Sequence, residues 1–200
     1  MINEFVWSET VNDLSICDLY LHFSCHLMKL FHIYIKTFEQ KSTNATNLFD
    51  LMINLKTKLE NRQKLKFFGT KVDQNLKNFN LKDRESFLSN ANTCYQRALN
   101  YLNDHFDYNN SIFKLLSKMN LDSSLEYNNL VTITSKLRIT VDRDLLFDEI
   151  NTFNEGLTEL NAKDMTSDTI TKYSQLLSSS ESLNLIKIVE TVLDFYPLYK

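Results

Sequence analysis

The chain has 200 residues, a net charge of −3, two glycines and one proline. Rossmann, Walker and nucleophile-elbow motifs each need several glycines at fixed spacing, so the sequence excludes these classes of enzyme. Hydrophobic residues make up 43% of the chain, which excludes an extended disordered protein. The composition therefore predicts an all-α protein whose helices are joined by polar turns.

The location of the protein is predicted from its cysteines and its N-terminus. The odd number of cysteines argues against a disulfide-built secreted domain. The first residues lack the basic segment of a signal peptide, and charged side chains interrupt the most apolar stretch, at 14–35. We expect an intracellular protein with no membrane contact.

Apolar residues recur at helical spacing through the first half of the chain. They predict helices over residues 14–39, 46–65 and 84–105, with a loop or a short irregular helix over 66–83 around Gly69. The first of these helices is the clearest. Its apolar face contains Ile16, Leu19, Tyr20, Phe23, Leu27, Leu30, Phe31, Tyr34 and Phe38. Its opposite face contains His22, Cys25, Lys29, His32 and Lys36.

The second half predicts two shorter helices. Asn109 or Asn110 is expected to cap a helix that carries Ile112 to Met119. A helix is also expected over 126–138, although the β-branched residues 131–134 make a strand the competing local structure.

Two further helices are expected near the C-terminus. Asp142 is expected to cap a helix that extends to Leu160. Residues 178–181 match a capping box, which predicts a helix over 181–195 that Pro197 ends. We expect residues 1–200 to form a single helical domain, with a possible subdivision near 120–124 into 1–120 and 125–200.

The residues give no convincing catalytic or metal site. His22, Cys25, His26 and His32 form the sharpest metal candidate, but His22 and His32 are about 15 Å apart along a helix axis. Cys94 falls on an apolar face, where a buried thiol is inert. The acid pairs Asp142/Asp144 and Asp148/Glu149 fit charges at a helix N-terminus better than an acid–base pair. We expect no metal, no cofactor, no small-molecule substrate and no enzyme activity.

Charge is unevenly distributed along the chain. Residues 56–84 carry nine basic against three acidic residues, a local charge of +6, whereas residues 142–164 carry seven acidic against two basic residues, a local charge of −5. Basic residues interleaved with aromatic ones are compatible with binding to a nucleic-acid backbone. The alternative, which residue chemistry alone favours, is a solvated helix face. The candidate nucleic-acid-binding residues are Lys56, Lys58, Arg62, Lys64 and Lys66.

Several segments resemble the helical region of hAT-superfamily DNA transposases, of the kind associated with BED-type zinc fingers or found as domesticated genes. Residues 80–87, followed by Cys94, Tyr95 and Leu99, are similar to a family helix of acidic, arginine and aromatic residues. Residues 105–116 resemble the segment that follows that helix, and Gly69 stands where the family often has a glycine. The resemblance extends over residues 14–196.

This resemblance implies an irregular multi-helix array like the helical insertion of an RNase H-like transposase. The family's catalytic carboxylates lie before and after such an insertion, so no catalytic residue can be carried over to this chain. The resemblance further implies a non-catalytic fragment or domesticated derivative, located in the nucleus, that acts through binding of DNA or protein. The alternative is an unrelated helical adaptor that binds a protein partner and has no nucleic-acid role.

Overall fold

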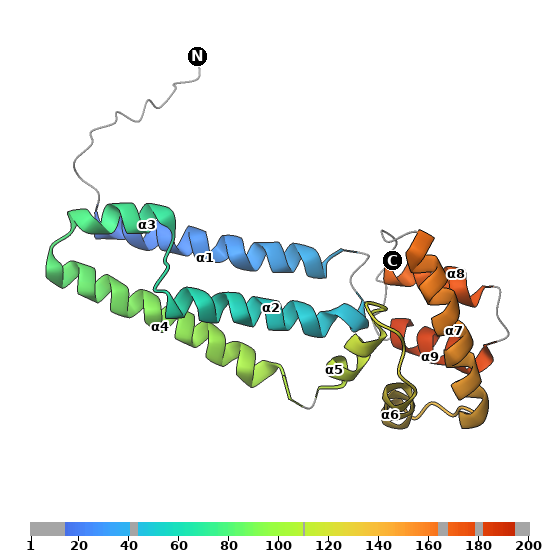
Figure 1. The fold of residues 1–200 in the computed structure, drawn as a ribbon. Helices are drawn as coiled ribbons and strands as arrows, with labels where there is room; N and C mark the ends of the chain where they lie inside the picture. Colours follow the sequence, from blue (N-terminus) through green and yellow to red (C-terminus); the bar gives the residue numbers. More distant parts are fainter. Residues whose placement is uncertain (1–14, 41–43, 110, 164–167, 179–181, 195–200) are drawn as a thin grey trace, which may run out of the picture. The chain divides into compact units, whose positions relative to one another are not determined.

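The computed structural model describes residues 15–40, 44–109, 111–163, 168–178 and 182–194. No residue in these ranges belongs to a β-strand, which confirms the predicted all-α class. The elements, in chain order, are the α-helices and two 3-10 turns drawn in Figure 1: α1 (Ile16–Phe38), α2 (Ala45–Lys64), α3 (Thr70–Asn75), η1 (Leu76–Asn78), α4 (Leu81–His105), α5 (Ile112–Leu116), η2 (Ser117–Met119), α6 (Tyr127–Leu137), α7 (Arg143–Lys163), α8 (Thr169–Leu177) and α9 (Leu183–Asp194).

The chain forms two compact units, and neither is a continuous piece of sequence. The first unit comprises Met1–Tyr34 and Lys56–Leu102, and the second comprises Ile35–Leu55 and Asn103–Lys200. The chain therefore passes between the units three times, within α1, within α2 and within α4. Residues 120–124, where the sequence suggests a possible boundary, lie inside the second unit.

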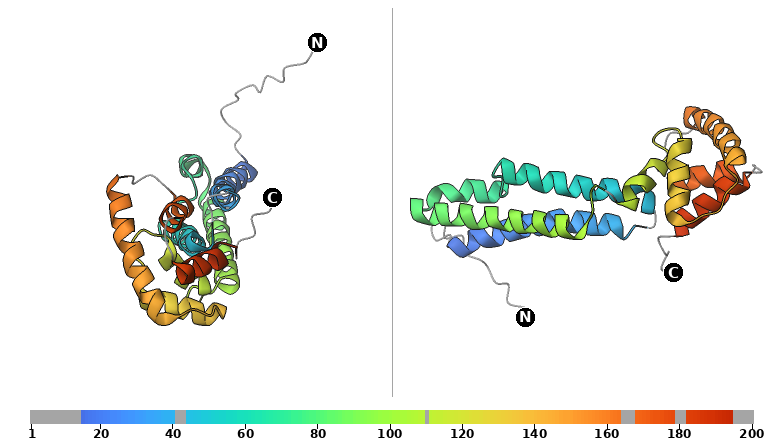
Figure 2. Two further views of the ribbon diagram at one scale, coloured as in Figure 1. Left: turned by 90° about the vertical axis from the view of Figure 1, so that its right-hand side faces the viewer. Right: turned by 90° about the horizontal axis from the view of Figure 1, so that it is seen from below.

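The first unit is built from parts of three long helices and the short α3. The Asn90 amide donates to the Tyr20 hydroxyl at 2.8 Å and so links α4 to α1, which run side by side in Figure 2. The Lys58 ammonium lies 5.2 Å from the centre of the Tyr34 ring and links α2 to α1. These contacts join α1 to both of the other long helices.

Four aromatic side chains form the centre of the first unit. Phe23 lies within 6.2 Å, centre to centre, of the rings of Phe68, Phe87 and Tyr95, in edge-to-face geometry. Phe68 is 1% exposed although it precedes α3 in an irregular segment. Edge-to-face and offset pairs of this kind add about 0.5–1.5 kcal/mol each beyond the area they bury. The 66–83 segment is therefore attached to the core through Phe68.

The second unit packs its helices around a separate aliphatic core. Asn154 of α7 binds the segment before α6 through two hydrogen bonds. Its side-chain amide accepts from Leu125 N at 2.8 Å and donates to Leu125 O at 3.0 Å. The Tyr173 hydroxyl of α8 donates to Met119 O at 3.0 Å. The buried core residues of this unit are Ala45, Leu116, Met119, Leu121, Leu125, Leu130, Ile133, Leu146, Ile150, Phe153, Leu157, Tyr173, Leu185, Ile188, Val189 and Val192.

Most predicted helices are confirmed, and the differences lie at their ends. Ser111 rather than Asn109 caps α5, because its hydroxyl accepts from Phe113 N at 3.1 Å; Asn110 lies outside the described residues. Residues 127–137 are helical, so the strand alternative for 131–134 is wrong. The sequence reasoning missed α8, whose N-cap Asp168 accepts from Thr171 N at 2.9 Å. The capping box at 178–181 lies largely outside the described residues.

Candidate functional site

The five basic residues singled out in the sequence do not form one solvent-facing row. Lys58 is exposed on α2, but Arg62, one turn further on, is half-buried. One terminal nitrogen of the Arg62 guanidinium is buried, and the group lies beside the Tyr95 hydroxyl. Burial raises the pKa of Tyr95, and the Arg62 charge opposes that rise. Arg62 therefore belongs to the contact between α2 and α4 rather than to a fully exposed basic face.

The remaining three basic residues lie on and just after α2. Lys56 Nζ is 3.9 Å from Glu60 Oε1, which offsets part of its charge. Lys64 is exposed at the last residue of α2. Lys66 ends the helix in a left-handed conformation with φ of 50°, and Phe67 N donates back to Arg62 O at 2.9 Å. This is the hydrogen-bond pattern of a Schellman cap, a position usually held by glycine.

The histidines of the sequence-based metal candidate separate into two groups. His22, Cys25 and His26 line one cavity between α1 and the start of α3, whereas His32 is exposed and does not line it. Within the described residues, no three His, Cys, Asp or Glu side chains are placed to hold a metal ion. Cys94 is half-buried on α4, and its thiol is free.

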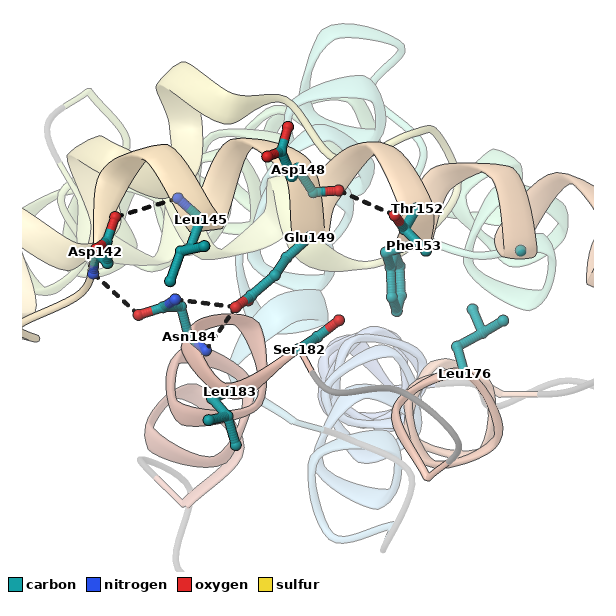
Figure 3. Close-up of a pocket in the computed structure, with 11 residues that line it drawn as sticks. Asp142, Leu145, Asp148, Glu149, Thr152, Phe153, Leu176, Ser182, Leu183 and Asn184 are labelled. Atoms are coloured by element: carbon teal, nitrogen blue, oxygen red, sulfur yellow. Dashed lines mark hydrogen bonds between the residues drawn. The ribbon is translucent and has the colours of Figure 1, made fainter.

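The second unit contains a groove of about 830 Å³ bounded by α7, α8 and α9 (Figure 3). Phe153 of α7 and Leu176 of α8 line one end of the groove. Leu145 and Leu183 stand at the other end and are 57% and 76% exposed. We call this site, lined by Asp142, Leu145, Asp148, Glu149, Thr152, Phe153, Gly156, Leu176, Ser182, Leu183 and Asn184, the acidic groove.

Glu149 connects the two long helices of the acidic groove. Its carboxylate accepts from Leu185 N at 2.7 Å, from Asn184 N at 3.2 Å and from Asn184 Nδ2 at 2.9 Å. Asn184 Oδ1 in turn accepts from Asp142 N at 3.0 Å. Figure 3 shows this chain of hydrogen bonds crossing from α7 to the first turn of α9.

Two of the four acids, Asp142 and Glu149, accept hydrogen bonds at a helix N-terminus. Asp142 Oδ1 accepts from Asp144 N at 3.0 Å and from Leu145 N at 3.2 Å, which confirms its predicted capping of α7. Glu149 also serves a helix N-terminus, but that of α9, 34 residues later in the chain. No local sequence signal could identify this partner, because the contact depends on how α7 packs against α9. Asp148 is left exposed at the groove.

The chemical character of the acidic groove follows from this arrangement. Phe153, Leu176 and the two exposed leucines supply apolar surface, and Asp142, Asp148 and Glu149 supply negative charge. Both Glu149 oxygens and the Asp142 Oδ1 atom already accept backbone N–H groups. The groove is therefore suited to hold a group that is both apolar and cationic.

Comparison with protein-family models, with curated protein sequences and with solved structures finds no match for this chain. Among the described helices, none contains a stretch that is both long and apolar enough to cross a bilayer.

Proposed function

We propose that this chain is a non-catalytic helical module that binds a protein partner, and that the acidic groove is its docking site. The observation that carries the proposal is the pair Leu145 and Leu183, which flank a groove of about 830 Å³ while remaining more than half exposed. Large exposed apolar side chains that border a concave surface are typical of interaction sites.

The partner expected in the groove is an amphipathic helix that carries Lys or Arg beside its apolar face. Its apolar side chains would contact Leu145, Phe153 and Leu183, as in other helix-in-groove complexes. Its basic side chains would lie near Asp142 and Asp148, which are exposed at the same groove. Charge complementarity of this kind selects among partners with similar apolar faces.

Selection from a library of helix-forming peptides displayed on phage tests this proposal. The wild-type chain should enrich peptides with apolar residues at i, i+3 or i+4, and i+7, and with Lys or Arg at the edge of that face. A Leu145→Asp/Leu183→Asp double variant should weaken binding of the enriched peptides about tenfold or more, because each leucine loses about 1 kcal/mol of apolar burial.

Leu81→Asp is the matched control, since Leu81 is 67% exposed but lies in the first unit. It should leave peptide affinity unchanged. Enriched peptides that bind the groove variant as tightly as the wild type would refute the assignment of the groove. Enrichment of acidic rather than basic peptides would refute the proposed partner chemistry.

The second candidate function is binding of nucleic acid, as the resemblance to transposase insertions implies. Lys58, Lys64 and Lys66 support it, because all three are exposed near the C-terminal end of α2. Three phosphate contacts would give a slope of log K against log salt of about −2.7. This candidate does not include Arg62, which is half-buried.

Retention of a duplex oligonucleotide, measured by anisotropy between 20 and 200 mM salt, distinguishes the two functions. Lys58→Glu, Lys64→Glu and Lys66→Glu combined should abolish retention if the basic residues contact phosphates. The Leu145→Asp/Leu183→Asp variant should bind DNA normally. A wild-type chain that shows no salt-sensitive retention at 20 mM salt would eliminate this candidate and, with it, the DNA-binding role implied by the family resemblance.

A further inference from the structure

A second cavity lies in the first unit. Its volume is about 400 Å³. One wall is a single face of α1, because residues 22, 25, 26 and 29 are spaced by three and four. The other wall is formed by residues 69–72. We call this site the histidine cavity; it is lined by His22, Cys25, His26, Lys29, Gly69, Thr70, Lys71 and Val72.

The side chains around the histidine cavity carry positive charge. Lys29 on α1 and Lys71 on α3 approach it from opposite walls, and both are exposed. None of the side chains that line it is a carboxylate. Asp73 does not line the cavity, but its charge acts on His26. A small cavity with ammonium groups on two walls suits an anion.

The His26 ring is fixed in place in the wall of the cavity. A Cβ atom at Gly69 would lie 2.9 Å from His26 Cγ, so the ring packs directly against the glycine backbone. Phe67 covers the ring in edge-to-face geometry at 5.2 Å. His26 Nε2 is buried and makes no hydrogen bond to any described residue. The charge of the imidazole therefore acts electrostatically on any ligand bound in the cavity.

The charges that face His26 come from three elements. Burial lowers the pKa of His26, and so do Arg62 on α2 and Lys29 on α1, while Asp73 on α3 opposes them. His22 and Lys71 line the same cavity. An anion placed between Lys29 and Lys71 would offset the positive charge near His26 and favour its protonated form.

We propose that the histidine cavity binds a small anion bearing a phosphate or sulfate group, held between Lys29 and Lys71. The protein partner proposed for the acidic groove is not involved, because the two sites share no residue. Since the bound anion stabilises protonated His26, binding takes up a proton. Affinity is therefore expected to rise as the pH falls through the region in which His26 titrates.

Sulfate is the appropriate first probe, because its charge does not change between pH 5.5 and 7.5. The full-length chain is titrated with sulfate at constant ionic strength, and the Cε1–H resonances of the histidines are followed by NMR. We expect a saturable shift of the His26 resonance and an affinity at least about twofold higher at pH 5.5 than at pH 7.5. A shift that does not saturate, or a binding constant independent of pH, would overturn the proposal.

Lysine variants test the placement of the anion. Lys29→Gln/Lys71→Gln should lower sulfate affinity about tenfold, since two exposed charge contacts together contribute about 1.4 kcal/mol. Lys77→Gln/Lys82→Gln removes two exposed lysines of the same unit that do not line the cavity, and it should leave affinity unchanged. Equal losses in the two variants would show that sulfate responds only to net charge and would refute a defined site.

Organic phosphates and DNA separate the sources of the anion. Phenyl phosphate should compete with sulfate, bind at least as tightly as inorganic phosphate, and depend on the same two lysines. A 16-base-pair duplex should not displace sulfate. If the duplex displaces it and loses affinity in the Lys29→Gln/Lys71→Gln variant, the cavity is part of a nucleic-acid surface and the proposal of a small anion is wrong.

Discussion

Gly69→Ala should destabilise the first unit, because both the backbone conformation and the space at this position are unsuited to a side chain. Gly69 has φ of 116° and ψ of 144°, which an L-residue adopts only at a cost of about 1–3 kcal/mol. The added Cβ would also lie 2.9 Å from His26 Cγ and 3.2 Å from His26 Cβ. Relief of that overlap requires the ring to move and costs about 1 kcal/mol or more. We expect a total loss of about 3 kcal/mol in the free energy of unfolding of the first unit.

Gly156→Ala is the matched control, and it should leave the free energy of unfolding of the second unit unchanged or raise it. Gly156 lies in the interior of α7, where alanine is favoured over glycine by about 0.8–1.0 kcal/mol. Its Cβ would meet Leu176 Cδ2 at 3.1 Å, and this flexible side-chain end can move by a few tenths of an ångström. We expect the free energy of unfolding to rise by between zero and about 1 kcal/mol.

Urea unfolding followed by circular dichroism, together with native-state hydrogen exchange, measures both variants. Hydrogen exchange assigns the loss to α1, α3 and α4 if the reasoning is correct. A Gly69→Ala/His26→Ala double variant removes the overlap with the ring but keeps the unfavourable φ, so it should still carry the backbone cost. If Gly69→Ala is as stable as Gly156→Ala, the argument from backbone conformation fails.

Three further predictions concern single residues: a buried hydroxyl, a carboxyl group with a raised pKa, and a lysine with positive φ. Tyr173→Phe keeps the ring but removes the hydroxyl that donates to Met119 O. The free energy of unfolding of the second unit, measured in urea, should therefore fall by about 1–2 kcal/mol. An unchanged unfolding midpoint would contradict the role of this hydrogen bond. Asp50 is an exposed residue, but partial desolvation of its carboxyl group and the nearby Asp122 charge raise its pKa. The folded state therefore favours the protonated form, and Asp50→Asn should be slightly more stable than the wild type at pH 7. This gain should disappear as the pH falls toward 3.8, as urea unfolding at several pH values would show. Lys66→Gly removes a side chain from a residue with φ of 50° and should stabilise the C-terminal end of α2 by about 1 kcal/mol, measured by the same method; a loss of stability would mean that the lysine side chain makes a compensating contact.

The helices were predictable because their apolar spacing and their caps are local signals. The apolar face predicted for the first helix supplies the buried residues Leu19, Phe23 and Leu27 of α1. Asp142 caps α7 as its position before an apolar run predicts. In α6, helical spacing overrides β-branched propensity, because Leu130 and Ile133 both pack into the core of the second unit.

The acidic groove and the histidine cavity were not predictable, because their contacts join residues far apart in the chain. Glu149 reads locally as one more acid on a helix, and only packing of α7 against α9 brings it to Asn184. Arg62 reads as one of a basic series, yet Tyr95 lies beside it and excludes it from the exposed face. His26 and Gly69 are 43 residues apart, and no periodicity relates them.

The interleaved order of the two units limits how the chain can be divided. Because segments of the two units alternate along the sequence, no single cut separates them into two intact pieces. A fragment that begins at residue 103 would lack Ala45, which belongs to the core of the second unit, and Phe49, whose ring lies 6.1 Å from that of Phe106. Such a fragment would expose to water the apolar surface that these side chains cover. A peptide comprising residues 35–55, added in trans, is the piece that would restore it.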